Sequence, residues 1–293
     1  MSTAVPAASL QAEGGAERVT RVMPHLGGVP ETMLWTLYDR ACEARRPNGV
    51  LVDPESVRIC DAIDYDFKGH FGQPSGAFAA RAAGIDHLLR RWLERHPDGL
   101  IVSLGEGLEV QAHRVDNGRM RWLTVDLPAA IALREYFLAP TGRFRHMAAN
   151  ATEPGWMDGI EPSDDIFIVA QGLFMYLQPE SVKQLFVDIA KRFPAAELAF
   201  DVIPRWFSWL TLWGVTQMPH YRLPPMPWGI SRHEIEPDLR SWTSSNTAVN
   251  ILDYRMPRGW PKALEDVCRA LPVARNEWPC LVHAVMGSNG WAH

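Results

Sequence analysis

Leu100–Pro128 reads LIVSLGEGLEVQAHRVDNGRMRWLTVDLP, and this stretch decides the fold of the chain. An apolar run ending at Leu104 is followed at once by a turn that contains Gly105 and Gly107. A second apolar run ends at Asp126. This order predicts a strand, a tight turn, a connection and a second, parallel strand. The two glycines allow the backbone to pass close to a ligand, because no Cβ stands in the way.

The acid at the end of the second strand indicates which ligand this turn suits. A carboxylate at Asp126 can accept both hydroxyl groups of an adenosine ribose, as in dinucleotide folds. The dinucleotide fingerprint needs a third glycine, and Val110 takes that place here. Glu106 and Glu109 also put negative charge where a pyrophosphate would lie. These features favour S-adenosylmethionine, which has a sulfonium cation and no phosphate, over a nicotinamide or flavin. A purely structural turn remains the alternative at this point.

Composition narrows the class of protein. The chain has 293 residues, 47% of them hydrophobic, which is enough for one large α/β domain. A formal net charge of −5 argues against nucleic acid as a partner. No apolar run reaches the ~18 residues that span a bilayer, so no membrane partner is expected. The four cysteines form no CxxC pair, which predicts reduced thiols in a cytoplasmic protein and no metal site.

The succession of elements predicts an α/β fold. Residues 1–20 are expected to form a flexible tail, and 21–98 a helical cap. Its helices are expected over 30–46, from 53 to a point within 61–67, and over 77–96, with a loop over 69–76. Strands are expected at 100–104, 122–126, 144–148, 166–170, 197–203, 249–254 and 281–286, with helices after 128 and 179. This alternation predicts one Rossmann-like core over 99–293, with a mostly parallel seven-stranded sheet covered by helices on both faces.

The segment 204–236, between the fifth and sixth strands, is too long and too aromatic for a simple connection. Its aromatic residues and histidine are Trp206, Phe207, Trp209, Trp213, His220, Tyr221 and Trp228. We expect it either to pack on the core or to form a lid over a pocket for an apolar or aromatic compound.

Five stretches between Gly28 and about Val202 resemble a known family. In chain order they are GVPETMLWTLYDRACEARRP, DYDF, VSLGEGLEVQAHRVDNGRMRWLTVDLP, AQGLFMYL and RFPAAELAFDV. They resemble class I S-adenosylmethionine-dependent methyltransferases of the leucine carboxyl methyltransferase superfamily, most closely bacterial tetracenomycin-type polyketide O-methyltransferases. The resemblance implies methyl transfer to a carboxylate, phenol or alcohol oxygen of a small polyketide-like natural product. S-adenosylhomocysteine would be the product, and no metal would be needed.

The resemblance also implies a set of cofactor-binding residues. They are Arg81, Gly105, Glu106, Gly107, Asp126, Leu127, Asn150, Ala151 and Gln171. Arg81 is expected to pair with the cofactor carboxylate, the alternative being an exposed helix charge. Asp126 is expected to hold the ribose, and Asn150 with its neighbour to bound the adenine. Gln171 stands where the family commonly has Glu. We therefore hypothesise that Glu106 faces the cofactor ammonium and offsets the missing charge.

The acceptor side is less defined by the sequence. A carboxylate acceptor is already ionised, whereas a hydroxyl acceptor needs a base, for which His220 is the candidate. Tyr221, beside it, and Tyr176, just past the fourth strand, are further candidates for the catalytic site. Each of the three has packing as its alternative. The family commonly has Arg, Asp and Glu where this chain has Gln111, Asn150 and Gln171. These departures keep open a non-catalytic binding or scaffold protein, and the fold keeps open a nicotinamide oxidoreductase. The expected partner is a small molecule, and the oligomeric state is not indicated.

Overall fold

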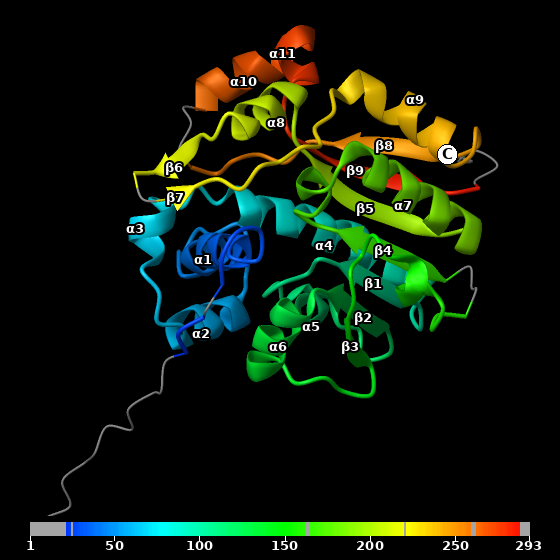
Figure 1. Cartoon of the computed structure of the whole chain (residues 1–293), viewed down its shortest axis with the longest axis horizontal. Coiled ribbons are helices and arrows are strands. Elements are labelled where there is room, and N and C mark those ends of the chain that lie inside the picture. The colour runs from blue at the N-terminus through cyan, green and yellow to red at the C-terminus, as the bar shows by residue number, and fades with distance from the viewer. Residues whose placement is uncertain (1–21, 25, 162–164, 220, 259–261, 288–293) are drawn as a thin grey trace, which may run out of the picture.

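The centre of the molecule is a seven-stranded sheet with the order β3-β2-β1-β4-β5-β9-β8 (Figure 1). A computed structural model describes residues 22–24, 26–161, 165–219, 221–258 and 262–287. The strands are β1 Leu100–Leu104, β2 Arg121–Asp126, β3 Phe144–Ala148, β4 Ile166–Ala170, β5 Glu197–Val202, β8 Ala248–Leu252 and β9 Cys280–Val285. The first five run parallel, and β9 lies antiparallel to both of its neighbours. The predicted mostly parallel seven-stranded sheet is confirmed.

Alternating side chains divide the core between the two faces of the sheet. On one face, Trp92 packs edge-on against Phe167, with ring centroids 5.5 Å apart. On the other, Phe186 meets Phe200 at 5.3 Å. The helices of the core are α4 Ala77–Arg95, α5 Gln111–Val115, α6 Pro128–Phe137, α7 Pro179–Arg192, α9 Arg232–Trp242, α10 Lys262–Ala270 and α11 Pro272–Asn276, with 3-10 turns η1 Pro154–Met157 and η2 Phe174–Tyr176. Both faces are thus covered, as strands buried on both sides require.

The strand order places a crevice beside β1. The chain moves from β1 to β2 on one side and returns to β4 on the other. The carboxyl ends of these parallel strands meet at one edge of the sheet, and ligands of open α/β folds bind where the order reverses. The turn after β1, the acid that ends β2 and the turn after β4 therefore come together.

The cap before β1 is helical, as the apolar periodicity predicts. It consists of α1 Thr32–Ala44, α2 Pro54–Ala62, α3 Phe67–Phe71 and the first turns of α4. The predicted loop over 69–76 is wrong at its start, because α3 extends through Phe71. The Asp66 carboxylate explains this helix, since it accepts a hydrogen bond from the Gly69 amide at 2.9 Å and caps its first turn.

The segment after β5 is a helix followed by a small hairpin. It comprises α8 Arg205–Leu212, β6 Thr216–Met218 and β7 Tyr221–Arg222 before α9 begins. Figure 1 shows the hairpin beside the cap and α8 beneath α10 and α11. Within the described ranges, no helix has the length and hydropathy that crossing a bilayer requires.

A buried ion network ties the cap to the turn after β1. Arg114 on α5 bonds Asp53 and Asp86 at 2.8 Å and Glu109 at 2.7 Å. Arg40 on α1 approaches the other Glu109 oxygen at 3.1 Å. All five side chains are at most 6% exposed. Burial opposes ionisation of Glu109, but Arg114 and Arg40 outweigh it and lower its pKa to about 2.

We predict that Arg114→Ala destabilises the protein by about 3–5 kcal/mol, because three buried carboxylates lose their shared cation. Urea unfolding monitored by circular dichroism measures the change. Arg119→Ala is the matched control, since that arginine pairs with Asp98 at the surface and its side chain is 59% exposed. The control should unfold like the wild type. A loss below about 1 kcal/mol for Arg114→Ala would show that the carboxylates do not depend on it.

Candidate active site

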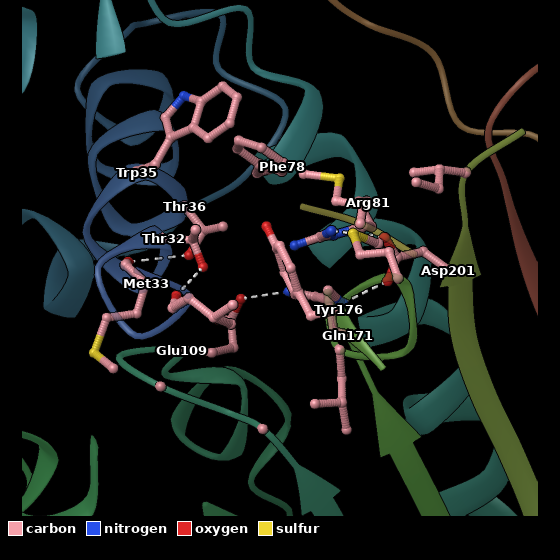
Figure 2. Close-up of a pocket in the computed structure, with 18 of the residues that line it drawn as sticks. Thr32, Met33, Trp35, Thr36, Phe78, Arg81, Glu109, Gln171, Tyr176 and Asp201 are labelled. Atoms are coloured by element: carbon pink, nitrogen blue, oxygen red, sulfur yellow. Dashed lines mark hydrogen bonds and ion pairs between the residues drawn. The ribbon is translucent and has the colours of Figure 1, made fainter. Parts of the chain in front are cut away.

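A cavity of about 590 Å³ opens at the edge of the sheet where β1, β2 and β4 end. This volume lies in the roughly 300–1,000 Å³ range of small-molecule sites. Its wall is formed by the turns after these strands and by α1 and α4 of the cap (Figure 2). Helix α8 completes the wall with Trp206 and Phe207. One continuous space therefore joins the predicted cofactor crevice to the predicted lid.

The glycine turn has the conformation that its sequence predicts. Gly105 has φ 63° and Gly107 has φ 54°, a region that favours glycine. A Cβ on Gly105 would lie 2.9 Å from Leu173, and one on Gly107 would lie 2.8 Å from Met33. Larger residues at either position would strain the backbone and push the turn away from its neighbours.

Asp126 lies at the crevice and holds the glycine turn. One carboxylate oxygen accepts the Gly107 amide at 2.7 Å, and the other accepts the Leu127 amide at 2.7 Å. Burial raises the pKa of this carboxyl, and the two backbone bonds only partly oppose the rise. Asp126 and Leu127 both line the cavity. The structure thus brings together three of the predicted cofactor residues.

Glu106 has its bonding partners inside the protein. Its carboxylate turns into the protein, where it accepts hydrogen bonds from Trp122 Nε1 at 3.0 Å and from the Thr124 hydroxyl. Arg134 Nη2 lies 3.1 Å from its other oxygen. Burial raises the pKa of Glu106, although Arg134 opposes the rise. These partners hold the carboxylate, although Glu106 also lines the cavity, and its place beside the ammonium stays a prediction.

Glu109, and not Glu106, contacts Gln171. Gln171 donates from Nε2 to Glu109 Oε2 at 2.9 Å (Figure 2). Since ionised Glu109 can only accept, this bond fixes the orientation of the amide. Gln171 Oε1 is then buried at the cavity wall without a hydrogen-bond partner among the described residues. Sequence reasoning missed this pair, which joins residues 62 positions apart in the chain.

Arg81 is buried at the cavity wall, so the alternative of an exposed helix charge is wrong. Its Nη1 bonds Asp201 at 2.7 Å, while the other Asp201 oxygen accepts the Gly172 amide at 2.6 Å. The guanidinium also lies 5.0 Å from the centre of the Phe78 ring. Arg81 Nε has no hydrogen-bond partner among the described residues. Asp201 was not predicted; its position at the end of β5 was the available signal.

Asn150 and Ala151 both line the cavity, on the side of β3. The side-chain Oδ1 of Asn150 accepts from the Thr152 amide at 3.1 Å and from the Thr152 hydroxyl at 2.9 Å. Its side chain therefore closes its own turn in this structure.

The three candidate residues for the acceptor side do not share one position. Tyr176 lines the cavity and projects toward Thr32 and Thr36 (Figure 2). Burial raises its pKa to about 12. Tyr221 is not among the described residues that line the cavity; it packs on Phe71 with ring centroids 4.9 Å apart. The structure therefore gives its ring the packing position that was the alternative, and a catalytic role for Tyr221 stays an untested prediction. His220 lies outside the described residues.

The far end of the cavity is apolar and aromatic. Helix α8 contributes Trp206 and Phe207 to it, as a lid would. The other apolar residues at this end are Trp35, Phe78, Met175, Ile203, Met226, Met256 and Trp278. The remaining aromatic residues of the segment have other positions, since Trp228 is in the core and Trp209 and Trp213 are exposed.

Comparison with known proteins agrees with this geometry. The fold and the crevice define the chain as an S-adenosylmethionine-dependent methyltransferase. A family model described as leucine carboxyl methyltransferase matches residues 33–190, and the chain belongs to that family. The resemblance seen in the sequence is confirmed, and the nicotinamide alternative is set aside.

Two relatives and one solved structure are similar to this chain. Tetracenomycin polyketide synthesis O-methyltransferase TcmP of Streptomyces glaucescens is 30% identical over 184 residues, which cover 62% of this chain and 68% of TcmP. The S-adenosyl-L-methionine-dependent methyltransferase dpfgK of Gibberella zeae is 29% identical over 199 residues, 60% of this chain and 66% of dpfgK. A Thermobifida fusca structure assigned as a methyltransferase has a TM-score of 0.53 at 12% identity, covering 87% of this chain and 94% of its own.

We predict that Gln171→Glu makes stability depend on pH. Its new carboxyl would lie beside ionised Glu109, so its folded-state pKa rises above the ordinary ~4.3. The loss of unfolding free energy relative to the wild type is then small near pH 4.5 and grows toward pH 8. It reaches about 1.4 kcal/mol for each unit by which folding raises the pKa of the new carboxyl. Thermal unfolding of the variant and the wild type at several pH values measures this difference. Gln171→Met, which adds no charge, should show a constant difference. A constant difference for Gln171→Glu as well would contradict the arrangement.

Proposed function

We propose that this protein transfers a methyl group from S-adenosylmethionine to an oxygen of a small apolar or aromatic molecule. The observation that carries the proposal is the single cavity, with a glycine turn and Asp126 at one end and aromatic side chains at the other. The relative whose name gives a substrate, TcmP, is an O-methyltransferase of polyketide synthesis. An acceptor related to such natural products suits the apolar end.

The residues of the crevice fit this cofactor. The turn would lose its close approach if either glycine carried a Cβ, and the buried Gln171 Oε1 needs a donor, such as an ammonium group. We propose that Gln171 binds the ammonium and Arg81 the carboxylate of the methionine part. Asp126 would bind the ribose, and Asn150 with its neighbours would bound the adenine.

The bound cofactor supplies an electrophilic methyl group on a good leaving group. The chain then contributes alignment, whose ceiling is about 7–11 kcal/mol, and exclusion of water. Tyr176 keeps its proton, because its pKa is raised to about 12. We therefore propose that it donates a hydrogen bond that positions the acceptor oxygen and does not act as the base. A carboxylate acceptor needs no base, and a hydroxyl acceptor remains the alternative.

We predict that the protein converts S-adenosylmethionine to S-adenosylhomocysteine in the presence of an aromatic carboxylic acid or phenol. Mass spectrometry of a panel of such compounds detects the acceptor that gains one methyl group, and fragmentation locates it on oxygen. Saturated polar acids of similar size serve as the control panel and should not react, because the acceptor end is apolar. Methylation on nitrogen or carbon would contradict O-methyl transfer. Cofactor binding without turnover on any acceptor would favour the non-catalytic alternative.

We predict that Asp126→Ala weakens binding of S-adenosylhomocysteine at least hundredfold from a micromolar Kd. Two charge-assisted hydrogen bonds to the ribose, each about 1.5–3 kcal/mol, would be lost. Isothermal calorimetry measures the affinity, and circular dichroism checks that the turn still folds. Asp116→Ala is the control, since this acid bonds the exposed Arg143 at 2.7 Å outside the cavity. Wild-type affinity in Asp126→Ala would disprove our placement of the ribose.

A further inference from the structure

Helix α8 has its apolar face turned outward. Its buried positions are the small polar residues Ser208 and Thr211, which bond the Met226 carbonyl at 2.7 Å and the Met226 amide at 2.9 Å. Trp209 and Trp213 lie outside, 60% and 72% exposed. An ordinary surface helix has the opposite pattern, with its apolar stripe toward the core. The sequence of α8 therefore suits a helix that is covered on its outer side.

The exposed apolar surface is large for a monomer. Trp206, Leu210 and Leu212 of the same helix are 53%, 37% and 49% exposed. A tryptophan contributes about 150–250 Å², so the three indoles alone expose about 300–450 Å². This exposed area is within the range of the largest apolar patch on a typical monomer. With the two leucines added, this one helix would supply more than half of the ~800 Å² that each partner buries in a stable interface.

We propose that a second copy of this chain covers the outer face of α8, with the two helices packed about a two-fold axis. Such an axis lets one patch meet itself, so Trp209 and Trp213 of each copy would form the centre of the contact. Their rings already lie 5.3 Å apart and form one packed unit. Tryptophan is the residue type most enriched at the energetic centres of protein interfaces.

Charge favours a second copy over a lipid surface. Helices that lie on membranes carry lysines and arginines that attract anionic headgroups. The one basic residue of α8, Arg205, is bound to Glu234 by two bonds of 2.7 and 2.8 Å. The net charge of −5 adds repulsion from an anionic surface.

A partner on the outer face of α8 would also affect the cavity, because the other side of this helix forms part of the cavity wall. Trp206 and Phe207 of α8 line the apolar end of the cavity, and Trp206 Nε1 bonds the Glu277 carbonyl at 3.1 Å. A partner on the outer face would hold this wall in place. The effect on acceptor binding rests on the proposed function, whereas the contact itself does not.

Sedimentation velocity of the full chain, from about 1 to 100 μM, tests the contact at Kd values in that range. The wild type should sediment with twice the 33.0 kDa monomer mass. Trp209→Glu combined with Trp213→Glu should weaken the dimer at least hundredfold, because both changes bury charge at its centre. Tyr136→Glu, at a 62% exposed aromatic on α6, is the matched control and should stay dimeric. Thermal unfolding confirms that all three proteins are folded.

A wild type that stays monomeric over this range, or a double variant that dimerises as tightly, would overturn the proposal. Monomeric wild type that co-sediments with phosphatidylcholine vesicles, while the double variant does not, would identify the face as a lipid-binding surface instead. The readout is molecular mass, so these results stand whether or not the protein transfers methyl groups.

Discussion

The ionised state of Glu109 is the constraint on which the crevice depends. Two arginines, one from the cap and one from α5, hold this buried carboxylate charged, and it in turn fixes the amide of Gln171. The same contacts join α1 to the turn after β1, so the cap and the sheet form one wall of the cavity. Removing the charge would leave these two buried arginines to share only Asp53 and Asp86, which is costly. Stability of the cap and the shape of the cofactor crevice therefore have one physical origin.

The fold could be predicted because its signals are local. Buried parallel strands such as Ile166–Ala170 are nearly continuous apolar runs, and Pro128 and Pro179 begin helices where their fixed φ is suited. The glycine turn and the position of Asp126 could be predicted from the same local order of strand, turn and strand. The prediction failed for the short helix that includes Phe71. This helix depends on one side-chain cap, which the apolar periodicity does not report.

The details of the site could not be predicted from the sequence, because they depend on which way a side chain turns. Glu106 and Glu109 lie three residues apart on a turn with two left-handed glycines, and the sequence gives no reason to choose between them. The choice is made by residues distant in the chain, with Trp122 and Arg134 holding one acid and Arg40 the other. Tyr221 is similar, since only the packed cap shows that its ring belongs with Phe71.

Charge in the proposed cofactor site bears on the order of events in turnover. Among the described residues that line the cavity, the charged groups are two guanidiniums, Arg40 and Arg81, and four carboxyl groups, Glu106, Glu109, Asp126 and Asp201. S-adenosylmethionine carries one net positive charge, which its product loses together with the methyl group. In a site of low dielectric, an excess of carboxylates attracts the cofactor more than the product. In the proposed site, the charge that the reaction removes would contribute to binding the cofactor, and methyl transfer would then weaken the binding of the product.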